Sequence, residues 1–424
     1  MVSERRAPRP STMLPLWPLY VMFGLVPLWW LAGVFYAAWP LFGLLLLGLL
    51  AVRGSVRLPP GAACWLVFLG LVVLSAVRLS QVDQLASSAL RLAFYLTALV
   101  VCVYAYTAVR ERADWRRVLT PLMLFWLAMV ALGWVGVLAP DLSLVTPLER
   151  ILPHGLATTP FVHDLVHAYG TEFRINGAAT GRPAAPFPYT NNWGSCFALL
   201  VPCVLAYLVS APRGHRNPLW MVLLISLPLS LPPAFLTLNR GMFLSLGVAM
   251  VFVAVRALRH RQPRLLVGMA VLAVLGIALS QVIPLSTLIA QRTAVSPSTT
   301  DRMSLYEEAL RRIVDAPLLG YGGPATVDTT TAPAPVGTQG QLWLVLFSHG
   351  IPALLVLLAW YLVVIRSTAR SSTPAGLWLS GVPVAGLVQM PFYGLTYQNL
   401  SVLFVAVGVA TAAVAGAVPG GRPV

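Results

Sequence analysis

The chain contains no lysine, so its positive charge rests on arginine alone. Acidic residues are also scarce: Asp and Glu number 13 against 28 basic residues, and charged residues make up 10% of the 424 positions. So low a charged fraction excludes a soluble globular domain, in which about 25% of residues are charged. The net charge of +15 would favour nucleic acid as a partner of a soluble protein. In a chain this apolar, we expect no nucleic-acid partner.

Cysteine is nearly absent as well. Cys64, Cys102, Cys196 and Cys203 all lie inside apolar runs, where a thiol behaves as a small hydrophobic side chain. The sequence contains no Cys-x-x-Cys pair and no Cys/His ligand spacing. We therefore predict neither a structural disulfide nor a metal site, and no cofactor.

What the chain has in excess is apolar length. Hydrophobic residues make up 58% of it and the mean hydropathy is +0.80, which indicates an all-α polytopic membrane protein, because helices satisfy their own backbone in lipid. A span needs about 20 apolar residues. Runs of that kind predict twelve transmembrane helices, near 13–31, 33–52, 62–78, 90–109, 118–138, 192–210, 218–237, 241–258, 264–283, 341–365, 375–393 and 398–417.

Arginine placement predicts the orientation. With the N-terminus inside, 18 of the 28 arginines and only 3 of the 13 acids fall in inner segments, which then carry the whole net charge of +15. Positive loops stay on the cytoplasmic side, so both termini are expected there. A signal peptide is the competing interpretation of the start, but no small-residue cleavage site precedes a polar mature domain.

The organisation expected is a single membrane domain over residues 1–424 with two large outer loops, 139–191 and 284–340. Because every inner loop is short, function is expected on the outer face or in a cavity that opens to it. A stretch dense in charge, Ser296 to Gly350, begins in the second loop, and the apolar body is expected to present it.

The first outer loop contains two short helix-like pieces, from Thr146 to Leu152 and from Phe161 to Tyr169. Further on, Arg174 and Arg182 stand among glycine, proline and asparagine, which favour ordered turns. They are candidates for substrate binding, and loop solubility is the alternative. Asn192 opens the next span, where it is expected either to cap the helix or to contact substrate.

Arg240 occupies a tight turn, Asn239 to Gly241, between two apolar spans. An arginine at that depth is costly without a partner or a polar cavity. The alternative without a binding role is that the side chain snorkels to the lipid headgroups. We favour anion binding, because the planar guanidinium fits phosphate oxygens.

In the second outer loop, Thr300 or Asp301 is predicted to cap a helix that continues to about Val314. Arg302 then falls in the first turn, where a helix N-terminus attracts anions. The remaining charges of this helix are expected to form a solvated face with i,i+4 pairs, and its predicted apolar face consists of Leu305, Ala309, Leu310 and Ile313. The bend at 320–323, which contains Tyr321, allows a close backbone approach.

Several of these pieces, taken in order, resemble the O-antigen ligase and polymerase family of membrane glycosyltransferases, a GT-C-like class. The matching pieces are RINGAATGRP, PYTNNWG, LNRG, DRMSLYEEALRRIVDAPLLGYG, GTQGQLW and SHGIPALL, between residues 174 and 355. Each piece alone is a weak match to the family, but their order and their places in the predicted topology make the whole match moderately specific.

The resemblance implies a metal-independent enzyme of the bacterial cytoplasmic membrane. Such proteins move a glycan from a polyprenyl diphosphate to a hydroxyl of a glycan or glycolipid acceptor on the outer face, surrounded by membrane lipids. Outer arginines hold the diphosphate, which the resemblance assigns to Arg174, Arg240 and Arg302. Tyr321 is carried over as a substrate-binding residue.

The sequence departs from the family pattern at one position. Family members often have a histidine at the start of the span after the second loop, whereas this chain has Gln339. Glutamine can bind a sugar hydroxyl but is no general base. Asp164, His163, His167, Glu172 and Asp328 remain as possible bases, while His349 lies deeper and is expected to be a packed histidine.

Two other functional classes are open at this stage. A transporter or flippase of lipid-linked glycans would place ionisable residues near the membrane midplane, whereas here the spans contain almost no acids. A non-catalytic scaffold for envelope assembly is the other alternative, and Gln339 is its best support. Glycosyl transfer, as ligase or polymerase, is the leading hypothesis.

Overall fold

The computed structural model describes residues 13–79, 82–111, 113–173, 179–211, 217–282, 298–327 and 334–416. The helices of the first half are α1 (Trp17–Gly24), α2 (Val26–Ala32), α3 (Phe35–Arg53), α4 (Ala62–Ser75) with the 3-10 turn η1 (Ala76–Arg78), α5 (Val82–Arg110), α6 (Trp115–Leu138), α7 (Pro147–Ile151), α8 (His154–Ala157) and α9 (Pro160–Val166). Those of the second half are α10 (Thr190–Val209), α11 (Pro218–Leu236), α12 (Arg240–Arg259), α13 (Pro263–Val282), α15 (Ser298–Ile313), α16 (Gln341–Thr368), α17 (Pro374–Gln389) and α18 (Gln398–Gly416).

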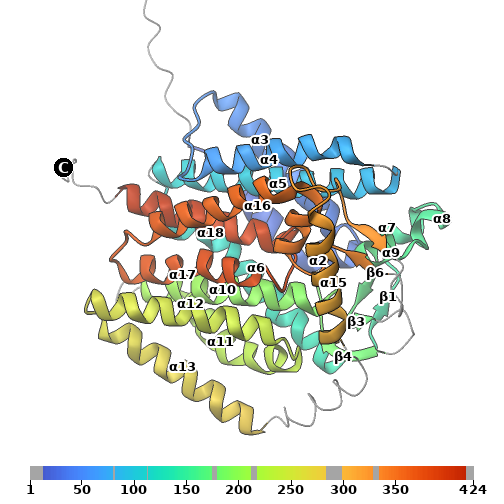
Figure 1. The fold of residues 1–424 in the computed structure, drawn as a ribbon. Helices are drawn as coiled ribbons and strands as arrows, with labels where there is room; N and C mark the ends of the chain where they lie inside the picture. The colour runs from blue at the N-terminus through green and yellow to red at the C-terminus, as the bar shows by residue number, and fades with distance from the viewer. Residues whose placement is uncertain are drawn as a thin grey trace, which may run out of the picture.

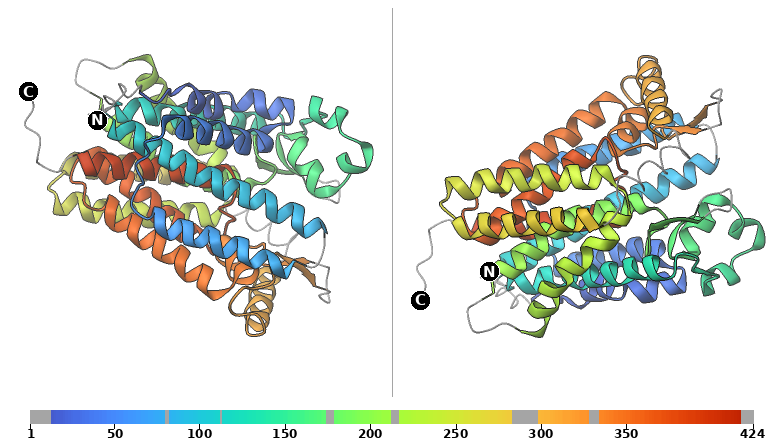
Figure 2. Two further views of the ribbon diagram at one scale, coloured as in Figure 1. Left: turned by 90° about the horizontal axis from the view of Figure 1, so that it is seen from above. Right: turned by 90° about the horizontal axis from the view of Figure 1, so that it is seen from below.

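The described strands form three small antiparallel hairpins outside the long helices. They pair β1 (Ser143–Leu144) with β2 (Ala168–Tyr169), β3 (Thr171–Phe173) with β4 (Ala179–Pro183), and β5 (Ala325–Val327) with β6 (Ala334–Val336). These hairpins, the short helices α7 to α9 and the helix α15 gather at one end of the bundle, here called the loop end (Figure 1). The C-terminal helix α18 finishes at the opposite end (Figure 2).

The expected all-α membrane architecture is confirmed, but the count of twelve spans is not. Among the described residues, eight helices are long and apolar enough to cross a membrane: α3, α5, α6, α10, α11, α12, α16 and α18. The first expected span divides at Leu25 into α1 and α2, where Pro27 supplies no backbone donor. Helix α17 has only 16 residues, and α4 has 14 before its 3-10 turn.

Buried polar side chains join the central helices of the bundle. Ser195 of α10 donates to the side-chain oxygen of Gln389 of α17 at 2.6 Å, and Asn399 of α18 donates to Ser195 at 3.1 Å. Toward the end opposite the loops, Arg256 of α12 donates to Ser380 at 2.6 Å. Such bonds satisfy polar groups in an apolar interior, so they fix the scaffold beneath the loop end.

Helix α16 is broken at Gly350, whose φ of 85° and ψ of 177° are essentially restricted to glycine. The predicted glycine bend packs against this break. Tyr321 donates its backbone N–H to the carbonyl of Phe347 at 2.9 Å, and a Cβ on Gly320 would lie 2.4 Å from the same oxygen. The expected close backbone approach is confirmed, and the bend supplies donors that α16 lacks at its break.

The charged face of α15 agrees with the sequence prediction, whereas its start does not. The helix is already formed at Ser298, so Thr300 and Asp301 lie inside it and the predicted cap there is wrong. The ends of a helix are harder to predict from a sequence pattern than its presence. Glu308 binds Arg311 at 2.8 Å and Arg312 at 2.5 Å, and these hydrogen bonds lower the pKa of Glu308 to about 2.

The apolar face of α15 differs from the prediction at one position. Leu305, Ala309 and Ile313 are buried, and the first two pack in a cluster with Phe347 of α16. Leu310 is 51% exposed, because its place in the helical repeat turns it away from α16. The face against α16 is therefore narrower than the sequence predicts.

Candidate functional site

A cavity of about 660 Å³ lies at the loop end, between the first outer loop, α5 and the start of α16. Segments far apart in sequence meet there, which is common for ligand sites between helices. Half of its lining residues are aromatic or amide and two are charged. The lining consists of Tyr36, Gln84, Ser87, Arg91, Asp164, Leu165, Tyr189, Asn191, Asn192, Pro324, Thr338, Gln339, Leu344, Phe392, Tyr393, Gly394, Thr396 and Tyr397.

Arg91 of α5 is the arginine that lines this cavity. It falls within Gln84–Arg110, one of the candidate spans. Its Nη1 is buried and has no hydrogen-bond partner among the residues that the structure describes. An ionised group left without a partner in an apolar span is costly, and guanidinium binds phosphate or carboxylate well. The cavity is therefore suited to an anionic group.

Asp164 of α9 lines the same cavity and is partly exposed. The hydroxyl of Tyr189 donates to Oδ2 of Asp164. Desolvation and the charge of Asp164 both raise the pKa of Tyr189, so the phenol stays protonated and remains a donor. Asp164 thus has one oxygen oriented by Tyr189 and its carboxylate beside the open volume.

Two predicted site residues, Asn192 and Gln339, also line the cavity. Asn192 donates to the hydroxyl of Tyr36 at 3.4 Å, and the amide of Gln339 contacts the side chain of Thr338 at 3.4 Å. The predicted capping role of Asn192 is wrong, since the N-cap of α10 is Tyr189, which makes no side-chain cap. Both amides face space in which sugar hydroxyls would fit.

Arg240 does not line the cavity but lies beside it. It is the first residue of α12 and is exposed. Its neighbour Asn239 accepts a hydrogen bond from the hydroxyl of Tyr393, and a Cβ on Gly241 would lie 2.5 Å from that oxygen. Because Tyr393 lines the cavity, the turn that carries Arg240 supports one of its walls.

Arg302 belongs to α15, and its side chain lies outside the described residues. One turn later, Tyr306 donates to the carbonyl of Pro391 at 3.2 Å and stacks on Trp343 at 4.3 Å between ring centroids. The segment after Pro391 continues into the cavity wall at Phe392. The turn that carries Arg240 and the turn of α15 that follows Arg302 therefore contact the same connection between α17 and α18.

The remaining predicted substrate-binding residues lie elsewhere. Arg174 and the candidate base Asp328 fall outside the described residues. Tyr321 donates to the carbonyl of Arg312 at 2.9 Å and stacks on Phe347 at 4.7 Å, so it holds the bend against α16. His349 is buried, with Nδ1 2.6 Å from the hydroxyl of Ser75, as expected for a packed histidine.

Arg182 has contacts that give it a structural role. It is buried on β4, where Nη1 binds Glu172 at 2.8 Å and Nε donates to the carbonyl of Thr237 at 2.8 Å. The side chain thus ties the first outer loop to the end of α11. Glu172, a candidate base, is occupied by this ion pair.

We expect Arg182→Met to lower the free energy of unfolding by about 3 kcal/mol, since removing one partner of a buried ion pair costs about 3–5 kcal/mol and Glu172 keeps 19% side-chain exposure. Unfolding in detergent measures it. Arg150→Met is the matched control, because Arg150 is an exposed arginine of the same loop. Equal stability of the two variants would contradict the structural role.

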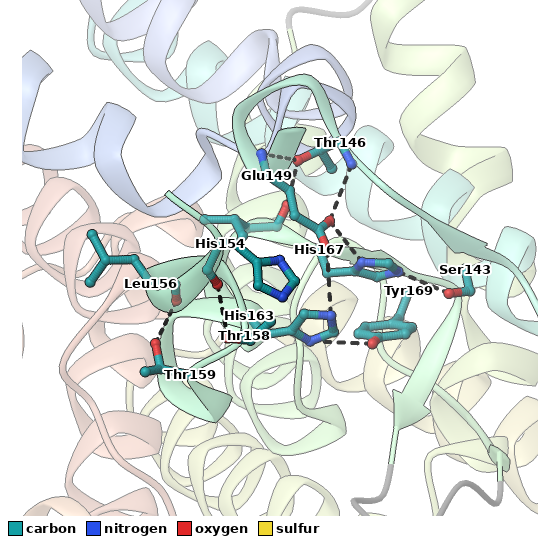
Figure 3. A network of polar contacts seen from close by, with 11 residues as sticks. Ser143, Thr146, Glu149, His154, Leu156, Thr158, Thr159, His163, His167 and Tyr169 are labelled. Carbon is teal, nitrogen blue, oxygen red and sulfur yellow. Dashed lines mark hydrogen bonds and ion pairs between the residues drawn. The ribbon is translucent and has the colours of Figure 1, made fainter. Parts of the chain in front are cut away.

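Two histidines of the first outer loop, His163 and His167, form a compact group with Glu149 (Figure 3). Nδ1 of His167 lies 2.8 Å from Glu149, and Nε2 of His163 lies 3.5 Å from its other oxygen. Burial lowers the pKa of His167, although Glu149 opposes that shift. These two candidate bases are absent from the cavity lining, in contrast to Asp164, which lies between them in the sequence.

Sequence reasoning thus found Asp164, Asn192 and Gln339 but missed Arg91, Tyr189 and Glu149. For Arg91 the signal was an isolated arginine at the start of an apolar run. For Glu149 it was the pattern Thr146-x-x-Glu149, which forms a complete capping box at α7. Tyr189 had no comparable signal, because an aromatic before a span is common.

The family model described as O-antigen ligase matches residues 225–358, which include Arg240, Arg302 and Gln339. No curated protein matches the chain. The match and the eight apolar helices indicate a glycan-transferring, multi-pass protein of the bacterial inner membrane. The segment 225–358 is therefore similar to the O-antigen ligase family.

Proposed function

We propose that the chain transfers a glycan from a polyprenyl diphosphate to an acceptor hydroxyl, with the reaction in the cavity at the loop end. The observation that carries this proposal is Arg91, which lines the cavity together with Asp164, Asn192 and Gln339 and whose buried Nη1 has no hydrogen-bond partner among the described residues. A leaving diphosphate needs fixed positive donors, and a hydroxyl nucleophile needs a base. The cavity offers one candidate for each.

The proposed step moves one proton and breaks one bond. The acceptor oxygen attacks the anomeric carbon while Asp164 takes its proton, and the bond from that carbon to the diphosphate oxygen breaks. Arg91 meets the charge that develops on the leaving group. Tyr189 holds one oxygen of Asp164, which leaves the other for the acceptor.

The predicted catalytic residues keep proposed places around this centre. Arg240 and Arg302 are proposed to bind the diphosphate from the wall formed by the connection between α17 and α18. Gln339 and Asn192 are proposed to hydrogen-bond sugar hydroxyls, since an amide both donates and accepts. With glutamine at position 339, the base is assigned to Asp164.

The test supplies protein in vesicles with a polyprenyl-diphosphate-linked oligosaccharide and follows released polyprenyl diphosphate by chromatography. Release is expected only when an acceptor is present, in equal amount to the glycosylated product. A glycolipid acceptor tests ligase activity, and a second lipid-linked oligosaccharide tests polymerase activity. If the intact lipid-linked glycan passed between leaflets and no polyprenyl diphosphate were released, the function would be transport and not glycan transfer.

A further inference from the structure

Glu149, His163 and His167 are brought together by two short helices of the first outer loop. Glu149 lies in α7, His163 in α9, and His167 is the residue on which α9 ends. One atom from each of the three side chains lies within 4.8 Å of the others. Figure 3 shows the two imidazole rings turned toward the Glu149 carboxylate.

The outward nitrogen of each histidine is also engaged. Nε2 of His167 lies 2.8 Å from the hydroxyl of Ser143, and Nδ1 of His163 lies 3.4 Å from the hydroxyl of Tyr169. Metal-binding histidines typically use the second nitrogen in this way, which fixes the tautomer and the ring orientation. The inner nitrogens, Nδ1 of His167 and Nε2 of His163, are the ones directed at Glu149.

Glu149 is held independently of the histidines. Its Oε2 accepts the backbone N–H of Thr146 at 3.3 Å, and its own N–H donates to the Thr146 hydroxyl at 3.3 Å. This capping box fixes the carboxylate at the start of α7. The three ligand groups are thus oriented by the loop itself.

We propose that Glu149, His163 and His167 form a Zn²⁺ site, with water as the fourth ligand. Imidazole nitrogen and carboxylate oxygen are established zinc ligands, and two histidines with one glutamate leave one tetrahedral position open. Zinc bonds of 2.0–2.1 Å imply about 3.3 Å between ligand atoms. The Glu149 contacts of 2.8 Å and 3.5 Å lie on either side of that value.

Zinc binding would fix the tautomer of His167. In the structure, Nδ1 faces Glu149 and Nε2 faces Ser143. When Nδ1 binds the ion, Nε2 carries the proton and donates to the Ser143 hydroxyl. On His163 the ligand is Nε2, and Nδ1 donates to Tyr169. No redox change or further reactant is needed.

The contacts of Ser143, His167 and Glu149 also have the order of a hydrolytic triad. That interpretation leaves His163 without a role, although His163 faces the same carboxylate and stacks on His167 at 4.7 Å between ring centroids. The zinc site uses all three groups and explains both outward contacts. The two interpretations differ in what Ser143→Ala does to metal affinity.

The site would fix the part of the loop that faces the cavity. An ion shared by α7, the middle of α9 and the C-cap of α9 restrains α9, which also carries Asp164. The site is independent of the proposed reaction, since none of its ligands lines the cavity. This proposal departs from the sequence prediction of no metal site, which considered only cysteine-based spacing.

The experiment uses the full chain, purified in detergent without a polyhistidine tag, stripped with a chelator and loaded with Zn²⁺. We expect one tightly bound zinc per chain by elemental analysis. Loading with Co²⁺ instead is expected to give the visible absorption of a tetrahedral ion. Both signals should be lost in Glu149→Gln and in the double variant His163→Ala/His167→Ala.

His154→Ala is the matched control, because His154 is an exposed histidine of the same loop and should leave zinc binding unchanged. Ser143→Ala should weaken zinc affinity by about 10- to 100-fold, as loss of an outer hydrogen bond to a ligand does. Zinc should raise the Tm of the wild type and of His154→Ala but not the Tm of the variants that lack a ligand side chain. A wild type that retains no more zinc than Glu149→Gln overturns the proposal.

Discussion

Arg91→Gln is expected to lower the rate of polyprenyl diphosphate release by about 10²–10³-fold, the loss typical when one fixed donor to a developing charge is removed. Arg91 carries a buried nitrogen without a described partner at the cavity. Glutamine keeps much of the side-chain length and polarity but not the charge. Because the donor stabilises the leaving group, the loss should fall on kcat more than on the KM for the lipid-linked donor.

Two further variants separate charge from geometry at this position. Arg91→Lys keeps the charge but loses the planar fork, so an intermediate rate is expected. Arg370→Gln is the matched control, since Arg370 is exposed at the end of the bundle opposite the loops and lines a different cavity. A wild-type rate in Arg91→Gln would remove Arg91 from the diphosphate site and return that role to Arg240 and Arg302.

The membrane architecture was predictable because its cause is local. A run of apolar residues must form a helix in lipid, and each expected span after the first corresponds to one helix in the structure. Breaks within such a run depend on backbone details that hydropathy does not contain. Leu25 divides the first run, and Gly350 breaks α16 where the glycine bend supplies donors from another segment.

The candidate site was predictable only in part, because three-dimensional neighbours are not sequence neighbours. Asn192 and Gln339 stood out as polar residues at the starts of spans, and both line the cavity. From the sequence, Arg182 was an equal candidate for ligand binding, but in the structure its guanidinium is paired with Glu172 of the neighbouring strand. In the sequence, Arg91 resembles an arginine that flanks a membrane span. Only the packing around α5 places it at a cavity.

Asp164→Asn is expected to lower the transfer rate by about 10²–10⁴-fold, the range in which a positioned general base contributes. Asparagine keeps the shape and still accepts a hydrogen bond from Tyr189, but it cannot take the acceptor proton. Donor binding should persist, because Arg91 is unchanged. The rate is measured as release of polyprenyl diphosphate at saturating donor and acceptor.

The matched control is Asp141→Asn, since Asp141 is an exposed acid of the same loop and should leave the rate unchanged. Tyr189→Phe removes only the hydrogen bond that orients Asp164, so a smaller loss than in Asp164→Asn is expected. Undiminished transfer in Asp164→Asn would show that the proton leaves by another route, with leaving-group stabilisation supplying most of the rate.

Gln339→His tests the proton route from the other wall of the cavity. Histidine has an unperturbed pKa of about 6.5, so it can accept a proton near neutral pH, and position 339 lines the same volume as Asp164. Introduced into Asp164→Asn, it is expected to restore part of the lost rate. Such rescue would require both positions to reach the acceptor hydroxyl, which a purely structural role for Asp164 does not predict.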